Sequence, residues 1–220
     1  MPEGHRMTPL QVRATMRDPV TFTFGTVALD ALLAGQVARR DGLPEHRRGR
    51  PTDAQPVPPL ERAEGGFYLA SWAIPSELLW SYATHVHKPC PTDWYIRLCT
   101  DAVKRVDIGT GADKAYRIAR SRQMFRELTW FCLGDAAAIR TLLLGVTRLG
   151  SYRRDGIGKV RSWSVEPTEP WDGFPVVLGG LPLRSLPIGY PGLSPGHRTG
   201  MSSLRLPLWE PLYQELCAIP

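Results

Sequence analysis

Apolar and polar residues alternate near the start of the chain and then take up a helical spacing. The alternation runs over residues 9–24 in two short bursts, which predicts one strand bent at the Asp18-Pro19 step. Leucines and a valine then recur every three or four residues, which predicts a helix from about 27 to 40 with Thr26 as its N-cap. We therefore expect a strand followed by a helix.

The middle of the chain has a weaker pattern. Residues 41–65 contain five prolines and few apolar residues, which predicts a loop or a disordered connection. Residues 66–74 are aromatic and β-branched enough to predict a strand. The next segment, 76–100, shows no single period, and we expect a short helix followed by a strand from Trp94 to Cys99.

The clearest pattern lies in the second half of the chain. Residues 127–134 are strongly apolar, which predicts a central strand. A helix is expected to follow, capped by Asp135 and ended by Gly150. Residues 159–167 then alternate like a strand. The apolar face of the helix is expected to contain Ile139, Leu142, Leu143, Val146 and Leu149.

This order of elements (strand, helix, strand, strand, helix, strand) is that of a ferredoxin-like or RRM-like domain. We therefore expect an α+β fold with one such domain over residues 8–167. Residues 168–220 are rich in proline and glycine, which argues against one long helix or one central strand there. They are expected to form an irregular extension that packs on the core.

Composition says more about the partner than about the fold. The 220 residues include 27 Lys and Arg against 21 Asp and Glu, a net charge of +6, and 43% are hydrophobic. This apolar content is enough for a real core. The positive charge is a modest indication of nucleic acid or another anionic partner.

The cysteines and the apolar runs indicate a cytoplasmic protein. Cys90, Cys99, Cys132 and Cys217 form no CxxC pair, and we expect reduced thiols. The opening MPEGHRMTPL is polar and interrupted by prolines, unlike a signal peptide. No apolar run reaches the roughly 18 residues of a membrane span, so no membrane association is expected.

Residues 148–163, RLGSYRRDGIGKVRSW, combine glycines with cations between two apolar runs. Glycine permits positive φ and lets phosphate approach the main chain, where N–H groups can donate hydrogen bonds. Arginine can hold phosphate with two parallel bonds, and tyrosine can stack on a base. The alternative is a helix-to-strand connection whose charges are only solvated. The residues concerned are Gly150, Tyr152, Arg153, Arg154, Gly156, Gly158 and Lys159.

A second basic run, KAYRIARSRQMFR, covers residues 114–126 and contains no acid. Cations interleaved with aromatic residues suit single-stranded nucleic acid, whose charge and bases both need partners. The alternative is an exposed, charged segment. The run contains Lys114, Arg117, Arg120, Arg122 and Arg126, interleaved with Tyr116 and Phe125. A third cluster in the proline-rich loop, which carries the least weight, contains Arg47, Arg48 and Arg50.

Common catalytic motifs are absent from the sequence. The glycine-rich stretch lacks GxxxxGK[ST] and GxGxxG, so nucleotide hydrolysis is not expected. The sequence also contains no HExxH, GxSxG or paired-carboxylate signature. His85 and His87 precede Cys90 and Cys99, but this spacing matches no common zinc finger, so we expect no metal and no cofactor. The histidines could instead act as acid and base in RNA cleavage, or lie in polar surface. The seven tryptophans are expected in the core or at interfaces.

Three segments resemble CRISPR proteins. The segment from LTWFCLGD through LLLGVTRLG to GIGKVRSWSVEP is similar to the RAMP superfamily, in which a glycine-rich loop follows the second helix of an RRM-like fold. The early FTFGTVALDALLAG and the closing LRLPLWEPLYQELCAIP resemble subunits of type IV CRISPR systems. By resemblance, the chain is identified as a Csf subunit equivalent to the RAMP protein that binds the 5′ handle of CRISPR RNA (crRNA).

The resemblance implies a noncatalytic RNA-binding subunit of a type IV CRISPR ribonucleoprotein, which serves antiviral defence. Such a subunit would hold the crRNA 5′ handle, cap the filament of backbone subunits, and contact the large subunit near the place where target DNA enters. Residues 75–125 would form a thumb-like insertion that contacts the next subunit, with Lys104 and Arg105 among its cations. The expected RNA-binding residues are Arg148, Ser151, Tyr152, Arg153, Arg154, Gly156, Gly158, Lys159, Arg117, Arg120, Arg122 and Arg126.

Two other hypotheses stay open. Glycine loops recur across the superfamily, including its repeat-processing endonucleases, so the loop alone does not separate a handle binder from a nuclease. A metal-independent endoribonuclease that cuts CRISPR repeats would need an acid or base, with His85, His87 or Tyr152 as candidates. The third hypothesis is a generic RNA-binding or scaffolding domain outside CRISPR.

Overall fold

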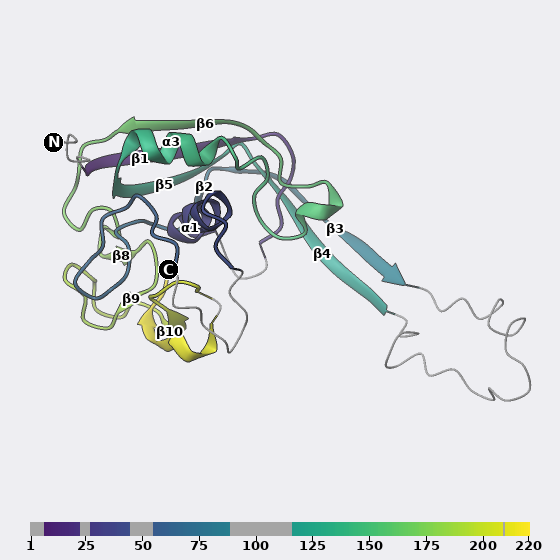
Figure 1. Ribbon diagram of the computed structural model, residues 1–220. Coiled ribbons are helices and arrows are strands. Elements are labelled where there is room, and N and C mark those ends of the chain that lie inside the picture. Colours follow the sequence, from purple (N-terminus) through teal and green to yellow (C-terminus); the bar gives the residue numbers. More distant parts are fainter. Residues whose placement is uncertain (1–6, 23–26, 45–54, 89–115, 209) are drawn as a thin grey trace, which may run out of the picture.

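The computed structural model describes residues 7–22, 27–44, 55–88, 116–208 and 210–220 of the chain. Its centre is a four-stranded antiparallel sheet with the strand order β2-β5-β1-β6 (Figure 1). This sheet and two helices are consistent with the expected ferredoxin-like domain. The elements are β1 (Thr8–Met16), α1 (Leu29–Arg40), β2 (Ile74–Pro75), β5 (Glu127–Gly134), α3 (Ala136–Leu143) and β6 (Val160–Pro167).

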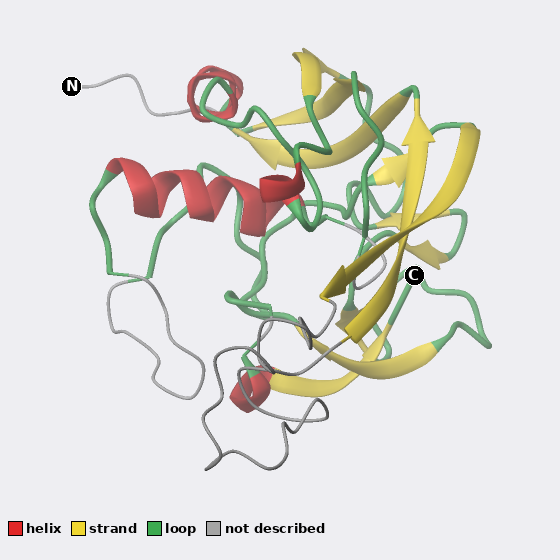
Figure 2. Cartoon of the chain, turned by 90° about the vertical axis from the view of Figure 1, so that its right-hand side faces the viewer, coloured by secondary structure: helices red, strands yellow, loops and turns green. Residues whose placement is uncertain are grey.

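The main hydrophobic core lies between this sheet and the two helices. In β1 and β5 every second residue is buried, so the buried side chains of each strand share one face of the sheet. Leu33 of α1 and Ile139 of α3 belong to the same buried cluster. In Figure 2 the two α-helices lie to the left and most strands to the right. At the centre of the cluster, Trp130 donates a hydrogen bond from Nε1 to the carbonyl of Val27 at 2.8 Å.

Both predicted helices are present, with corrections at the start of the first. α1 begins at Leu29 with Ala28 at the N-cap position, and no side chain caps it. Thr26, predicted as the cap, lies outside the described residues. Asp135 caps α3 as predicted, because its Oδ1 accepts hydrogen bonds from two backbone N–H groups at 2.9 and 3.1 Å.

The second helix is shorter than predicted, since α3 ends at Leu143 and not near Gly150. The chain tightens there: the N–H groups of Gly145 and Val146 bond to carbonyls three residues back, at 3.2 and 2.9 Å. Glycine also disfavours a helix interior by about 1 kcal/mol. Val146 and Leu149 are nevertheless buried in the main cluster, so the apolar pattern marked burial correctly but not helix length.

The first predicted strand is divided into two parts. β1 ends at Met16, and the chain bends at Asp18-Pro19 as predicted. Beyond the bend, Val20 exchanges two backbone hydrogen bonds with Gln123, at 2.8 and 2.9 Å. Val20, at the start of the second burst of alternation, therefore lies beside another strand, β4 (Tyr116–Phe125), and not in the central sheet.

A two-stranded hairpin takes the place of the short helix predicted after residue 75. β3 (Leu78–Lys88) pairs with β4 (Tyr116–Phe125), and the two strands project away from the central sheet (Figure 1). Most residues of β3 are exposed, so no alternation of buried and exposed positions marked this strand in the sequence, and a bulge interrupts its register near the start. The strand predicted from Trp94 to Cys99 lies outside the described residues.

Residues 66–74 lie beside β5 but are less regular than predicted. Ala70 makes an isolated bridge to Cys132, and the N–H of Ser71 donates to the carbonyl of Phe131 at 2.8 Å. Regular strand geometry is reached only in β2. The loop predicted at 41–65 is described only at its two ends.

The chain after residue 167 builds most of a second, smaller core, to which Phe67 also belongs. Its buried cluster contains Phe67, Val176, Val177, Leu186, Leu204, Cys217 and Ala218. The strands are β7 (Val177–Leu178), β8 (Leu181–Pro182), β9 (Leu186–Pro187), β10 (Thr199–Ser203) and β11 (Gln214–Ala218). β10, β11 and β9 form a three-stranded sheet in that order. The division of the chain into a domain over 8–167 and an extension over 168–220 that packs on it stays a prediction.

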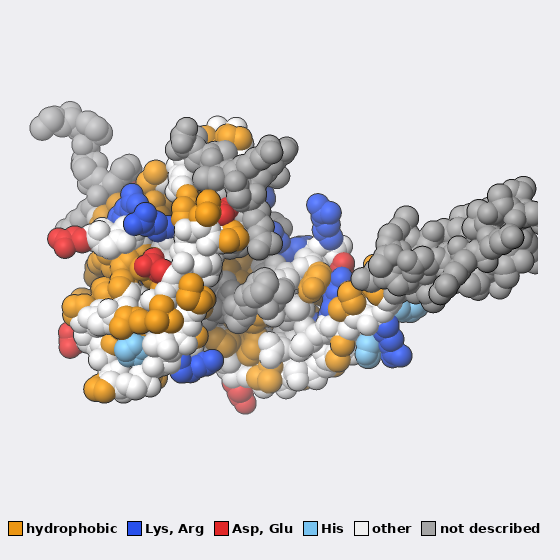
Figure 3. Space-filling view, turned by 90° about the horizontal axis from the view of Figure 1, so that it is seen from below, with side chains coloured by type: hydrophobic (Ala, Val, Ile, Leu, Met, Phe, Trp, Pro, Cys, Tyr) orange, Lys and Arg blue, Asp and Glu red, His pale blue; other side chains and the backbone are white. Residues whose placement is uncertain are grey.

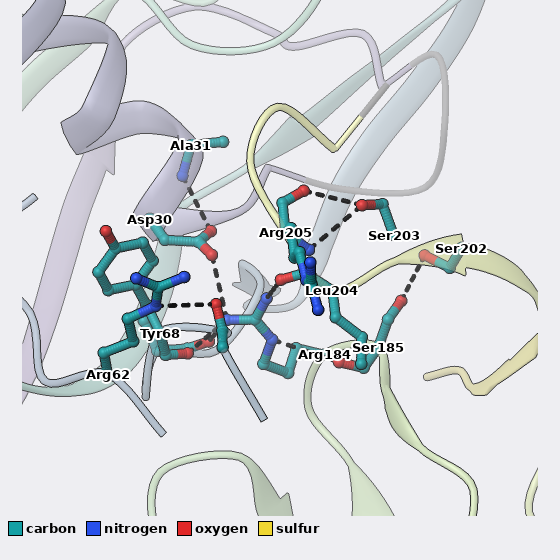
Figure 4. Close-up of polar contacts among 12 residues, drawn as sticks. Asp30, Ala31, Arg62, Tyr68, Arg184, Ser185, Ser202, Ser203, Leu204 and Arg205 are labelled. Atoms are coloured by element: carbon teal, nitrogen blue, oxygen red, sulfur yellow. Dashed lines mark hydrogen bonds and ion pairs between the residues drawn. The ribbon is translucent and has the colours of Figure 1, made fainter. Parts of the chain in front are cut away.

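A buried ion pair joins this second core to the first helix (Figure 4). Arg184 is fully buried, and its Nη1 lies 3.1 Å from Oδ2 of Asp30 in α1. The guanidinium also donates to the backbone carbonyls of Tyr68, Ala70 and Leu204. A buried charge is tolerated only when it is paired and hydrogen-bonded, and Arg184 meets both conditions.

The described cysteines are free and buried. Burial raises the pKa of the Cys132 thiol to about 12, so this thiol stays protonated near neutral pH. Cys90 and Cys99 lie outside the described residues. None of the helices in the described part of the chain is long and apolar enough to cross a membrane.

Candidate nucleic-acid interface

The glycine loop, defined here as residues 148–159, connects the end of α3 to β6. Its two ends are held together by a bridge between Arg148 and Lys159 and by the N–H of Leu149, which donates to the carbonyl of Gly158 at 2.8 Å. A single 3₁₀ turn, Arg153–Asp155, forms its tip. The loop therefore has a defined backbone closed at its base.

Two of the three loop glycines are required by packing inside the protein. Gly150 has φ +79°, and a Cβ there would lie 2.7 Å from the carbonyl oxygen of Thr21. Gly158 has φ +75°, and a Cβ there would collide with the carbonyl of Leu149. The expectation that the absent side chains leave room for phosphate therefore does not hold at these two positions. Only Gly156, with φ +84° and nothing within 4 Å, opens onto free space.

The tip of the loop contacts the hairpin through Arg120 of β4. The Arg120 guanidinium lies 3.7 Å from the ring centroid of Tyr152 and pairs with the carboxylate of Asp155. Tyr152 has φ 58°, a left-handed conformation that is uncommon for a residue with a side chain. Two basic runs about 30 residues apart in the sequence thus meet at one place.

One face of the hairpin carries aromatic and cationic side chains side by side. In the register of β3 and β4, Tyr82 lies opposite Arg122 and Thr84 opposite Arg120, so all four point to the same face. Trp80 belongs to this face and stacks near Tyr82 with centroids 5.3 Å apart. We call these five residues, together with Tyr116 and Ile118, the hairpin face. Figure 3 shows cationic, hydrophobic and histidine side chains along the hairpin as a whole, which includes its other face.

The aromatic residues of β3 on the hairpin face, Trp80 and Tyr82, were not among the site residues predicted from the sequence. Trp80 and Tyr82 are 44% and 43% exposed, so Trp80 does not lie in the core, and an interface role for it stays a prediction. Trp130, by contrast, is fully buried. The signal that could have identified the face is the spacing Trp80-x-Tyr82, which places both rings on one side of a strand.

Three polar atoms of the hairpin face are buried and lack a partner among the described residues. They are Oγ1 of Thr84, Nε of Arg120 and Nε of Arg122. Arg122 does approach the hydroxyl of Tyr82 with its Nη1, at 3.4 Å. Unpaired buried polar groups are rare and costly, so each of these atoms requires a water molecule or another polar group as its partner.

The other predicted site residues take several places. Arg153 and Arg154 are exposed at the loop tip and form no ion pair within the described ranges. Arg148 donates to the carbonyls of Gly156 and Ile157, so its guanidinium helps to close the loop. Lys159 is half-buried at the loop base. The backbone N–H of Ser151 donates a hydrogen bond to the carbonyl of Thr21 at 2.8 Å. In the second run, Arg126 is exposed just after β4, and Lys114 lies outside the described residues.

His85 and His87 lie on the face of the hairpin that is opposite to the hairpin face. His85 pairs with Ala119 and His87 with Arg117, and these positions alternate with those of the hairpin face. Arg117 and both histidines therefore point to the opposite face from Tyr152. Among the described residues, no three His, Cys, Asp or Glu side chains are close enough to hold a metal ion.

Comparison with known proteins finds one family. Residues 81–219 match the family model described as CRISPR type IV associated protein Csf3, a match that covers most of β3, all of β4, the glycine loop and the C-terminal strands. No curated protein matches the chain.

Proposed function

Because the chain belongs to the Csf3 family of type IV CRISPR-associated proteins, we propose that it is a noncatalytic effector subunit that binds crRNA through the glycine loop and the hairpin face. The observation that carries the proposal is the contact of Arg120 with Tyr152 and Asp155, which joins two basic segments into one surface. Phosphates would be held by cations, and unstacked bases would lie on aromatic rings.

The chemistry of this surface suits single-stranded RNA. Arg153 and Arg154 extend from the loop tip without ion-pair partners in the described part of the chain, so they are available to phosphate. On the hairpin face and the loop, Trp80, Tyr82 and Tyr152 offer partly exposed rings. Because base stacking is tolerant of sequence, we expect affinity for the strand to exceed any preference for particular bases.

The place of the subunit in the complex follows from the resemblance to RAMP proteins. We expect it to hold the 5′ handle, to cap the filament of backbone subunits and to contact the large subunit near target DNA. The projecting β3–β4 hairpin lies within 75–125, the segment expected to be a thumb-like insertion, and could reach a neighbouring subunit.

Loss of the two cations at the loop tip is expected to weaken RNA binding. Arg153→Ala with Arg154→Ala removes two phosphate contacts, so affinity should fall and the slope of log K against log salt should decrease by about 1.4 for a single strand. Fluorescence anisotropy of the full chain with labelled 5′-handle RNA, at several salt concentrations, measures both quantities.

The matched control is Arg39→Ala with Arg40→Ala, which removes two neighbouring exposed arginines at the end of α1. This variant has the same net charge as the loop variant but should bind the RNA like the original chain. Equal affinities for the loop variant and the original chain would mean that the loop only connects α3 to β6.

The alternative function is cleavage of CRISPR repeats. The structure favours it less, because His85 and His87 point away from Tyr152 and from the glycine loop. We expect no cleavage when the purified chain is incubated with repeat RNA in EDTA. Specific cuts under these conditions would establish a metal-independent endoribonuclease.

A further inference from the structure

A small polar pocket lies between the turn at residues 62–66 and the C-terminal strands, built from elements other than the glycine loop and the hairpin. Its volume is about 230 Å³, below the range of about 300–1,000 Å³ that is typical of drug-sized sites, so it suits a small ligand. The residues that line it are Gln55, Pro56, Val57, Arg62, Gly66, Tyr68, Arg205, Leu206 and Tyr213. Figure 4 shows Arg62, Tyr68 and Arg205 around the buried Arg184.

Two arginines converge on this pocket across a glycine. A Cβ on Gly66 would lie 3.7 Å from Nη2 of Arg62 and 3.8 Å from Nε of Arg205, so both guanidiniums border the same small space. Gly66 has φ +82°, and its carbonyl accepts a hydrogen bond from Nε of Arg62 at 3.1 Å, which fixes that guanidinium at the pocket.

Neither arginine has an acidic partner in the part of the chain that the structure describes. The ion pairs formed there involve Arg13, Arg40, Arg120, Arg148 and Arg184, but not Arg62 or Arg205. Two like charges beside one cavity repel each other, and an anion between them would relieve that repulsion. Arginine in such a pair can also bind phosphate with two parallel hydrogen bonds.

Aromatic and amide groups make the pocket suitable for more than a simple anion. The Arg62 guanidinium carbon lies 6.0 Å from the ring centroid of Tyr68, so a cation and an aromatic ring already lie near each other in the pocket. Tyr213 adds a second ring, and Gln55 reaches its hydroxyl from Nε2 at 3.5 Å. Rings and an amide are the groups that recognise an unstacked base and its edge.

We propose that the pocket formed by Arg62, Tyr68, Arg205 and Tyr213 binds one nucleoside monophosphate unit, with its phosphate on the two arginines and its base against the tyrosines. This goes beyond the proposed function, because it assigns a second nucleotide site to residues that the glycine loop does not touch. The unit is either a free nucleotide or one nucleotide of a strand.

The test uses isothermal titration calorimetry of the full chain with uridine 5′-monophosphate (UMP), uridine and inorganic phosphate. UMP is expected to bind at least tenfold more tightly than either fragment, because only UMP engages both arginines and rings. Arg62→Gln with Arg205→Gln should weaken UMP binding about a hundredfold, since each charge-assisted hydrogen bond contributes roughly tenfold or more. Tyr213→Phe should retain binding that Tyr213→Leu reduces.

The controls separate this pocket from the glycine loop. Arg198→Gln removes an exposed arginine that does not line the pocket and should leave UMP affinity unchanged. The Arg153→Ala, Arg154→Ala variant should also bind UMP normally. The UMP result therefore stands even if the glycine loop proves not to bind RNA. The dinucleotide UpU tests the source: tighter binding than UMP indicates a strand, and equal or weaker binding indicates a free nucleotide.

Two results would overturn the proposal. The first is equal affinity for phosphate and UMP, which would reduce the pocket to an anion site. The second is UMP binding that Arg62→Gln with Arg205→Gln leaves unchanged. Both arginines are on the surface side of the pocket, so circular dichroism should show that the double variant is folded.

Discussion

Asp30→Ala is expected to lower the free energy of unfolding by about 3–5 kcal/mol. The change leaves the fully buried Arg184 without the carboxylate that lies 3.1 Å from its Nη1. An uncompensated buried charge is unfavourable, and the contact between α1 and the second core would be lost with it. Urea unfolding of the full chain, followed by tryptophan fluorescence, measures the difference.

Removal of both charges should be less damaging than removal of one. Asp30→Leu with Arg184→Met takes away the ion pair without leaving a lone charge, so part of the loss should be recovered. Recovery should be incomplete, because the backbone carbonyls around the guanidinium lose their donor. Asp41→Ala, which breaks the exposed Arg40–Asp41 pair at the end of α1, is the matched control and should leave unfolding unchanged. Equal effects of Asp30→Ala and Asp41→Ala would contradict a structural role for the buried pair.

Gly158→Ala is expected to destabilise the protein clearly more than Gly156→Ala, although both residues have positive φ in the same loop. The left-handed backbone alone costs an alanine about 1–2 kcal/mol. At Gly158 the new methyl group would also collide with the carbonyl of Leu149, which adds about 1–3 kcal/mol as overpacking. Chemical denaturation of the two variants and of the original chain measures the cost of the left-handed backbone at Gly156 and the added cost of the collision at Gly158.

Gly150→Ala provides the internal control for this comparison. Its methyl group would crowd Val20 and Thr21, so its effect should resemble that of Gly158→Ala. If all three substitutions had the same small effect, the close packing of the loop base would be contradicted. Gly156→Ala keeps the loop base intact and can therefore be used to test RNA binding without loss of the fold.

The parts of the fold with strong local patterns were predictable. The alternation in β1 and β6 and the apolar run of β5 marked three strands of the sheet, and Asp135 marked the start of α3. These signals are local, because a strand face and a helix cap involve residues only a few positions apart. The end of α3 was not predictable, because Val146 and Leu149 are buried in the core although the chain there is no longer helical.

The hairpin was missed for a different physical reason. Most residues of β3 are exposed, so burial does not impose the alternation that identifies a strand in the core. The strand is held instead by its pairing with β4, about 40 residues away in the sequence. The sequence around Trp80 and Tyr82 therefore does not show which segment of the chain pairs with them.

By itself, the sequence determined that a glycine-rich basic loop follows the second helix, that its glycines permit unusual backbone angles, and that two basic runs exist. Only the tertiary structure decided what these residues do. It placed Gly150 and Gly158 against the protein's own backbone, left Gly156 open, and brought Arg120 onto Tyr152. It also paired Arg184 with Asp30 and left Arg62 and Arg205 facing one pocket. Each of these contacts joins residues distant in the chain, so folding of the whole domain, and not any local pattern, creates them.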